Sequence, residues 1–335
     1  MNQTSTGVFA SASAVAVQYY FDSSVNEQSK RNVYTQLGFQ DLTVNQQDTQ
    51  MDALAGPGLA RLIAEGAAYE TEQRYREYPV TVNVRKYGVS IGLTEEVEAW
   101  LAGADTGKVI SEVKARTDVV TQSVLGKINQ QASQVLHLGF TSTSPVNNDT
   151  GLIGNSETLF GSHTIRGDAS TQRNTFATGD THRPLSPSAL VDAITIMNRY
   201  KSHSTIELLP VTNLLLVVSK ENDALATQIL TSLQGPNTPN LGNNQASESQ
   251  LNQRGFQIKK VVDPWIPSGS STYWFLIDLD RANNRWFMAY LWKLRLTQEA
   301  SPSTGSMQYL GSAMFRPVCI GWQHVFGSLG TNAII

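Results

Sequence analysis

The stretch Tyr78-Pro-Val-Thr-Val-Asn-Val-Arg-Lys-Tyr-Gly-Val-Ser-Ile-Gly-Leu93 alternates apolar with polar or small residues over most of its length. The alternating apolar residues are Val80, Val82 and Val84, followed by Val89, Ile91 and Leu93. A period of two is typical of a strand with one buried face. Gly88 separates the two runs, so a bend or bulge is expected there. The stretch therefore predicts a long, half-buried strand.

Residues 61–76, just upstream, can supply the returning strand of a hairpin. Its expected tip is crowded with charge, in Glu70, Glu72, Arg74, Arg76 and Glu77. A dozen residues each way, at ~3.3 Å per residue, give an arm about 40 Å long. A two-stranded ribbon of that length is marginal by itself in water. We therefore expect the arm to lie on another subunit, with these five charged residues as the intersubunit contact.

A long helix is predicted after the strand. Thr94 suits the N-cap of a first short helix, which Gly103 and Gly107 interrupt. From Lys108, apolar residues recur at threes and fours until Gly139, which sits where a C-terminal glycine is common. Roughly 30 residues at ~1.5 Å rise give about 45 Å. Because the apolar stripe is one face wide, we expect this helix to lie across a sheet rather than to be buried all round.

Composition narrows the possible functions. Charged residues make up 16% of the 335 residues, below the usual ~25%. The net charge of −3 and the lack of a Lys/Arg cluster argue against a nucleic-acid-binding face. The single Cys319 excludes an internal disulfide, and no Cys/His set has zinc spacing. The apolar run 10–17 is too short to span a bilayer and lacks a basic n-region, so we expect a protein made in the cytosol.

The remaining segments alternate strands with local helices. In chain order we expect a loop-rich segment at 141–185 with local order or a contact role, a helix at 186–200, a strand at 214–218 buried on both faces, a helix at 221–233 capped by Ser219, a Gly/Asn-rich loop at 235–255, and strands at 256–262, 273–279, 286–296 and 313–326. This order, without a repeating βαβ unit, predicts an α+β fold.

The order of these parts resembles the major capsid proteins of tailed bacteriophages, which have the HK97-like fold, and among them the Mu-like major head subunit type. The resemblance rests on the order and spacing of short motifs over residues 60–330. These motifs are Val84-Arg-Lys-Tyr-Gly-Val-Ser-Ile-Gly-Leu-Thr-Glu-Glu96, Asp149-Thr-Gly151 with Leu159-Phe-Gly-Ser-His163, Leu185-Ser-Pro-Ser-Ala-Leu190 with Met197, Leu209-Pro210 with Leu214-Leu-Leu-Val-Val-Ser219, and Phe315-Arg-Pro317 with Trp322-Gln-His-Val-Phe-Gly-Ser328.

The resemblance implies a division of the chain. Its parts would be an N-terminal arm (1–58), an extended hairpin or E-loop (59–93), the spine helix of a peripheral domain (94–140), a mainly axial domain (141–255) with the loop 235–255, and C-terminal strands (256–335) that complete the peripheral and axial sheets. The resemblance also implies a structural protein of the virion, not an enzyme. Copies of the chain would form hexamers and pentamers of an icosahedral shell that encloses double-stranded DNA without sequence-specific binding.

The implied partners are further copies of the chain, a separate scaffolding protein, a portal and decoration proteins, with assembly in the cytoplasm of the host bacterium and no membrane contact. No cofactor is expected. Two alternatives stay open. One is an encapsulin-like compartment shell, and the other is a metal-dependent hydrolase that uses the loop 149–182.

The hydrolase alternative depends on one acid and imidazole cluster, which comprises Asp149, His163, Asp168, Asp180 and His182. Catalysis would need these residues to converge. In a long loop such residues are more often solvated or turn-capping, so we predict no catalytic, cofactor or metal site. The aromatic residues Trp265, Tyr273, Trp274, Phe275, Trp286, Phe287, Tyr290 and Trp292 could suggest ligand stacking, but strand spacing favours core and subunit contacts.

Overall fold

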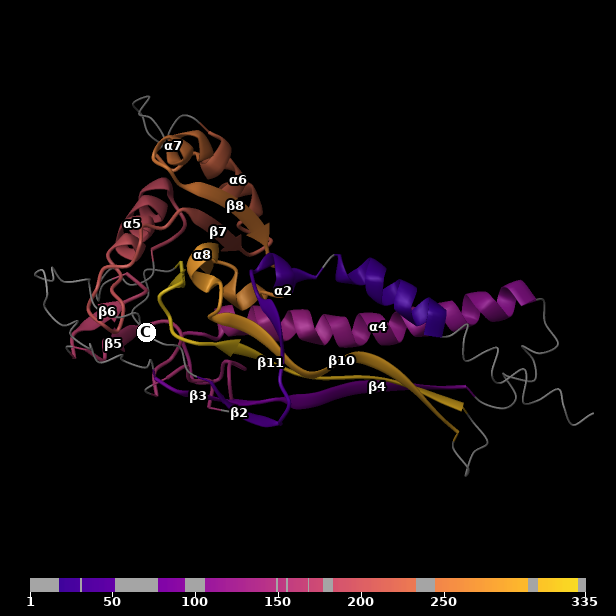
Figure 1. Ribbon diagram of the computed structural model, residues 1–335. Helices are drawn as coiled ribbons and strands as arrows, with labels where there is room; N and C mark the ends of the chain where they lie inside the picture. The colour runs from indigo at the N-terminus through magenta and orange to yellow at the C-terminus, as the bar shows by residue number, and fades with distance from the viewer. Residues whose placement is uncertain are drawn as a thin grey trace, which may run out of the picture.

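The chain forms two four-stranded sheets and one long helix (Figure 1). The computed structural model describes residues 18–30, 32–51, 78–93, 106–148, 150–154, 156–167, 169–176, 183–232, 245–300 and 307–330. The helices are residues 18–29, α2 (Val33–Gln36), α4 (Thr106–His137), α5 (Pro187–Asn198), α6 (Asp223–Thr231), α7 (Glu248–Gln253), α8 (Leu279–Ala282) and the 3₁₀ turn η1 (Ser268–Ser270). The strands are β1 (Gln40–Thr43), β2 (Asp48–Met51), β3 (Val80–Asn83), β4 (Arg85–Leu93), β5 (Ser162–Thr164), β6 (Thr171–Arg173), β7 (Asn213–Val218), β8 (Gln257–Val262), β9 (Trp274–Asp278), β10 (Trp286–Ala300), β11 (Met307–Cys319) and β12 (Val325–Ser328).

The first sheet has the order β1-β10-β11-β4, with β1 parallel to β10 and the other neighbours antiparallel. The helix α4 lies along one face of this sheet, and the two extend together away from the rest of the molecule (Figure 1). At Gly311 of β11 the helix comes so close that an added Cβ would overlap the Val120 side chain of α4. A glycine is therefore needed where the strand and the helix touch.

Alternate side chains of β10 and β11 enter two separate cores, because successive residues of a strand point to opposite faces. One set joins the main core with α4 and consists of Trp286, Met288, Tyr290, Ala313, Phe315 and Cys319. The other set consists of Ala289, Met314 and Val318, and it packs with Val44, Val80, Val82, Val84 and Ile320 under the antiparallel ribbon β2–β3. The first sheet is thus covered by a helix on one face and by a ribbon on the other.

The second sheet has the order β12-β9-β7-β8 and lies next to α5, α6, α7 and α8 (Figure 1). Its strand β7 carries five consecutive buried residues after Asn213, as the apolar run 214–218 predicts. The neighbours β7 and β8 are parallel and are joined through α6 and α7, which makes one βαβ unit. The α+β prediction is confirmed.

Two chain segments connect the sheets, residues 279–285 from β9 to β10 and residues 320–324 from β11 to β12. They are hydrogen-bonded to each other, since Ile320 N donates to Arg285 O at 2.8 Å. Arg281 pairs with the buried carboxylate of Asp278 at 3.1 Å and donates to the carbonyl oxygen of Met197 in α5 at 2.9 Å. Burial raises the pKa of Asp278, and the charge of Arg281 opposes that rise.

The strand stretch 78–93 differs from its prediction in two ways. The break falls at Val84, between β3 and β4, whereas Gly88 pairs in register with Ser312 of β11. Residues 80–83 pair with β2, and β4 pairs with β11 of its own chain. Residues 61–76, the expected returning strand, lie outside the described residues. The described part of the expected arm therefore lies on its own subunit, because β10 and β11 extend far enough to offer β4 a partner.

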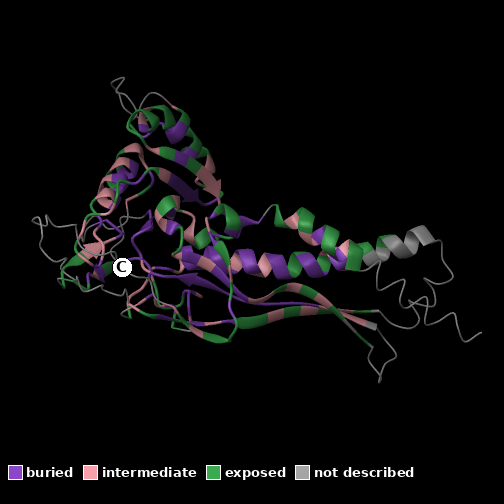
Figure 2. Ribbon diagram, viewed as in Figure 1, coloured by how far each residue is buried: buried purple, intermediate pink, exposed green. Residues whose placement is uncertain are grey.

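The long helix is confirmed, with observed bounds Thr106–His137. The expectation of one buried face is wrong for its C-terminal half, which Figure 2 shows as largely buried. There Asn129 accepts a hydrogen bond from Tyr34 N at 3.2 Å and donates one to Asn32 at 3.2 Å. Residues 32–51, which belong to the expected N-terminal arm, are thus packed into the body.

Other predicted elements are confirmed with adjustments. The helix at 186–200 is α5, whose cap Ser186 accepts a hydrogen bond from Ala189 N. The helix expected at 221–233 is α6, which starts at Asp223 after Asn222. Part of the loop expected at 235–255 is the helix α7, and residues 233–244 lie outside the described residues. The strand expected at 313–326 is two strands of different sheets, because the chain crosses between the sheets at 320–324.

We predict that Gly311→Ala lowers the free energy of unfolding by about 1–3 kcal/mol, the usual cost of overpacking a core. The added methyl group would overlap Val120. Urea unfolding of the unassembled subunit measures the change. The matched control is Gly92→Ala on β4, where a Cβ meets nothing within 4 Å. The double variant with Val120→Ala should lose less than the sum of the single losses, and strict additivity would contradict the proposed contact.

We predict that acidification destabilises the protein through His324. Burial, followed by the charges of Arg285 and Arg281, lowers the pKa of His324 well below 6.5. Below pH 6.5 the unfolded chain therefore binds a proton that the folded state does not, so the free energy of unfolding falls as the pH falls. A single such group contributes a loss of about 1.4 kcal/mol between pH 7.5 and pH 5.5.

The measurement compares urea unfolding of the wild type with that of His324→Leu at pH 7.5 and pH 5.5. The variant should lose less stability on acidification. His137, whose pKa burial also lowers, stays in both proteins. Burial raises the pKa values of Asp263 and Asp278 above 3.8. Between 3.8 and those raised values the folded state binds more protons than the unfolded chain, so these two groups make the protein more stable as the pH falls. Equal losses in the two proteins would contradict the role given to His324.

Candidate functional site

The charged residues predicted as an intersubunit contact, Glu70, Glu72, Arg74, Arg76 and Glu77, lie outside the described residues. The structure does describe the two points where segment 52–77 joins the body. Met51 ends β2 and is the antiparallel partner of Val80 in β3. The segment therefore starts and ends on neighbouring strands, and the ribbon β2–β3 is its stem.

The stem is held by backbone pairing and by one side-chain bond across the ribbon. Asn83 Nδ2 donates to Asp48 Oδ1 at 2.7 Å. Val80 and Val82 are buried on the sheet side, whereas Thr81 between them is exposed. The alternation seen in the sequence thus fastens the stem to the first sheet through its apolar face.

Asn147 links the stem to the rest of the chain. Its carbonyl oxygen accepts a hydrogen bond from Asn83 N at 2.8 Å, and its own N–H donates to Pro317 O at 2.9 Å. Its side chain donates to the carbonyl oxygens of Leu152 and Cys319 and accepts from Cys319 N at 2.9 Å. The residue is fully buried with φ at 60°, a conformation that asparagine tolerates better than most residues. Neighbouring sequence offers no signal for this role.

His163 is a packing residue in this structure. It is fully buried, with Nδ1 at 3.0 Å from Glu157 Oε2 and Nε2 at 3.2 Å from Asn174 Oδ1. Its ring stacks on Trp322 with centroids 4.6 Å apart and planes 9° apart. The expectation that it is solvated or caps a turn is wrong, because the small hairpin β5–β6 turns it inward.

The other members of the acid and imidazole cluster, Asp149, Asp168, Asp180 and His182, lie outside the described residues. Both ring nitrogens of His163 are already engaged by Glu157 and Asn174. Among the described residues, no three His, Cys, Asp or Glu side chains are grouped so that they could hold a metal ion. None of the helices in the described ranges has the length and apolar character needed to cross a membrane.

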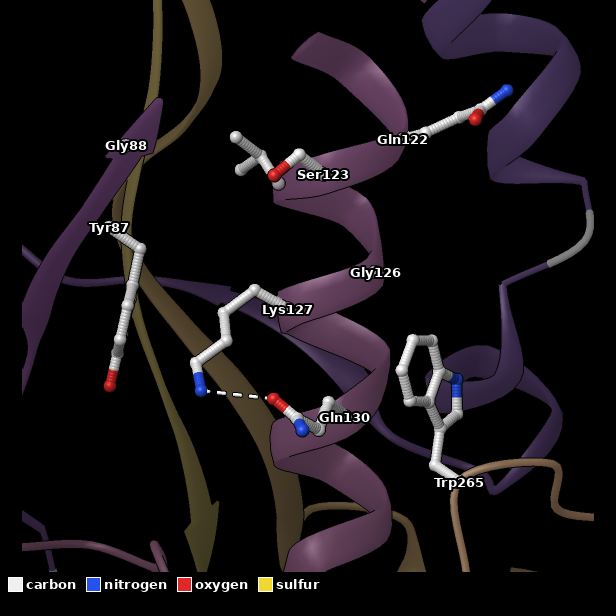
Figure 3. A pocket seen from close by; sticks show the side chains of 9 residues that line it. Tyr87, Gly88, Gln122, Ser123, Gly126, Lys127, Gln130 and Trp265 are labelled. Carbon is white, nitrogen blue, oxygen red and sulfur yellow. Dashed lines mark hydrogen bonds between the residues drawn. The ribbon is translucent and has the colours of Figure 1, made fainter. Parts of the chain in front are cut away.

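A groove of about 430 Å³ lies on the outer side of α4. Figure 3 shows Tyr87 of β4 and Trp265 on opposite sides of the helix. Lys127 and Gln130 lie between them, with Lys127 Nζ 3.0 Å from Gln130 Oε1. Trp265 packs close to Gly126, where an added Cβ would make an ordinary contact with the indole at 3.6 Å. Amide, hydroxyl, aromatic and lysine groups line the groove, which suits contact with another surface better than acid–base chemistry.

The aromatic residues flagged in the sequence are mostly core residues. Trp274, Phe275, Trp286 and Tyr290 are buried, as strand spacing predicts. Trp265 is 39% exposed and lines the groove on α4. The sequence pattern does not separate it from the others, because its position over α4 depends on tertiary packing.

Comparison with known proteins gives likeness in structure but not in sequence. No protein-family model matches the chain, and no curated protein matches it significantly. The capsid structure of cyanophage P-SCSP1u is similar over 88% of this chain and 87% of that chain, with 10% identity and a TM-score of 0.50. The satellite phage P4 procapsid that includes the size determination (Sid) protein matches over 98% and 97% (10% identity, TM-score 0.47), and a virus-like particle from Pyrococcus furiosus over 93% and 98% (8% identity, TM-score 0.44).

The likeness to the cyanophage capsid protein extends over most of both chains, so it concerns the whole arrangement of sheets and helices. At 10% identity it establishes the fold and nothing finer. The predicted HK97-like fold is confirmed.

We predict that Asn147→Ala destabilises the unassembled subunit by about 3 kcal/mol. The substitution leaves Cys319 N without its acceptor, and an orphaned buried group costs about 1–3 kcal/mol. Alanine at positive φ adds about 1–2 kcal/mol. The control is Asn284→Ala, an exposed residue with φ at 66°, which should show the conformational cost alone. Equal losses at the two positions in chemical unfolding would remove the linking role of Asn147.

Proposed function

We propose that this chain is a structural major capsid protein that assembles into hexamers and pentamers of an icosahedral shell around double-stranded phage DNA. The observation that carries the proposal is the HK97-like fold, shared with a cyanophage capsid protein over most of both chains. A fold alone does not fix a function.

Segment 52–77 is the part of the chain we assign to contact with a neighbouring subunit. The strand before it, β2, pairs with the strand after it, β3, so the described residues on its two sides lie next to each other. It contains both signs of charge in Glu70, Glu72, Arg74, Arg76 and Glu77. A mixed set of charges can pair with a complementary set on an identical subunit.

The charge of the chain supports enclosure of DNA without sequence-specific binding. The net charge is −3, and strong phosphate binding needs concentrated Lys and Arg. We assign no catalytic activity, because His163 is engaged in packing with Glu157, Asn174 and Trp322. The proposed location is the virion after assembly in the host cytoplasm, with a scaffolding protein, a portal and decoration proteins as further partners.

The test of the function is the size and content of what the purified chain forms. Negative-stain microscopy and light scattering should show capsomers or closed particles of megadalton mass. A stable small oligomer under all assembly conditions would overturn the shell function. Particles that enclose a protein cargo but never DNA, even when produced with the other phage proteins, would favour the encapsulin-like alternative.

We predict that Arg74→Glu with Arg76→Glu leaves a folded subunit and abolishes or greatly weakens shell formation. If the arginines meet carboxylates of a neighbour, reversal replaces attraction with repulsion in a partly desolvated contact. Such pairs are worth about 2–5 kcal/mol when truncated, whereas exposed charges lose about 1 kcal/mol or less. The measurements are circular dichroism of the subunit and the yield of intact particles by sedimentation.

The matched control is Arg74→Gln with Arg76→Gln, which keeps side-chain length but removes the charge. Its particle yield should lie between that of the wild type and that of the reversed variant. Wild-type yields from the reversed variant would show that these arginines face solvent in the shell, and the contact role would be withdrawn.

A further inference from the structure

We propose that Tyr78 is the positioning residue that holds the C-terminal root of segment 52–77 and so sets where its charged residues lie. The effect of Tyr78 on assembly rests on the proposed shell function. Its structural part concerns the single subunit and can be tested without any shell.

Tyr78 lies close in the chain to the charged residues of segment 52–77. It is the first described residue after segment 52–77 and lies two residues before β3. Glu70, the first of the five charged residues, is eight positions before Tyr78 but 19 positions after Met51. At ~3.3 Å per residue, eight residues reach at most about 26 Å. The Tyr78 end therefore restricts the charged residues far more than the Met51 end does.

The Tyr78 ring is held from two sides. It meets the ring of His203 edge-on, with centroids 5.5 Å apart and planes at 87°. The guanidinium of Arg166 lies over it, 5.5 Å from its centroid. These two partners are themselves joined, since Arg166 N donates to His203 Nδ1 at 3.2 Å, and His203 is buried. The tyrosine thus contacts a single connected unit of the body, not two independent loops.

The main chain next to the ring is also confined. A Cβ added to Gly154 would lie 2.6 Å from Tyr78 Cβ, closer than real Cβ atoms approach, so the contact needs glycine at 154. Pro79 follows, and its ring fixes the backbone φ angle at the next position. Below Tyr78, a cavity of only about 10 Å³ separates it from Trp322 and Glu157. Tyr78 is half-buried, and the small cavity leaves its side chain little room to move toward the body.

The anchor is connected to the buried cluster around His163. Trp322 lines the cavity under Tyr78 and stacks on His163. Glu157 lines the same cavity and bonds to His163. This gives the His163 cluster a role in the proposed assembly, because the residues bonded to and stacked on His163 also line the cavity beside Tyr78.

The structural test is limited trypsin digestion of the unassembled subunit. Tyr78→Ala removes the ring, and Gly154→Ala displaces Tyr78 while leaving it intact. In both variants, cleavage after Arg76 should accelerate about fivefold or more, because cleavage follows the population of the opened root. The controls are Tyr78→Phe, which keeps the ring, and Gly269→Ala, where an added Cβ meets nothing within 4 Å. Both controls should digest at the wild-type rate.

Circular dichroism and the unfolding midpoint establish that each variant is folded. Unchanged cleavage after Arg76 in both folded variants would overturn the anchor. The assembly test is the yield of intact particles, which should fall severalfold in Tyr78→Ala and Gly154→Ala and stay normal in Tyr78→Phe. Faster cleavage with wild-type particle yield would overturn the positioning role. Absence of particles from the wild type itself would overturn the shell function and leave the digestion result to decide the anchor alone.

Discussion

The alternation of side chains along β10 and β11 is the constraint on which the rest of the structure depends. Because neighbouring residues of a strand face opposite sides, these two strands supply a core beneath α4 and a second core beneath the ribbon β2–β3. A shift of pairing by one residue would send each set of side chains into the other core, where its shapes do not match the neighbouring residues. The sheet, the long helix and the stem of segment 52–77 are therefore positioned together.

The same two strands also connect the molecule to its second sheet. The chain enters β10 after α8 and leaves β11 through residues 320–324, and these two crossings are bonded to each other. Arg281 extends this junction to α5 through the carbonyl oxygen of Met197. Asp278, Gln323 and His324 are buried polar or charged residues at this junction. Pairing of Arg281 with Asp278 offsets part of the cost of burying each charge.

Several polar residues are buried although their local sequence pattern indicates an exposed position. His163 lies in a loop-rich segment, where a solvated residue is expected. It instead stacks on Trp322, which lies 159 positions later in the chain. Asn129 occupies a polar position of α4, but it is buried and bonded to the segment that contains α2. Partners this distant in sequence leave no periodic signal near the residues themselves.

The sequence by itself determined the elements whose pattern is local: α4 from its apolar repeat and Gly139, α5 from Ser186 and Pro187, and β7 from its continuous apolar run. The order of those elements also indicated the HK97-like fold. Only the tertiary structure decided which strands pair. Residues 80–83 pair with β2, and residues 85–93 pair with β11. Residues 313–326 belong to two different sheets, and Tyr78 packs against His203 and Gly154. The physical reason is that periodicity reports which face of an element is buried, whereas the identity of the surface that buries it depends on contacts between residues far apart in the chain.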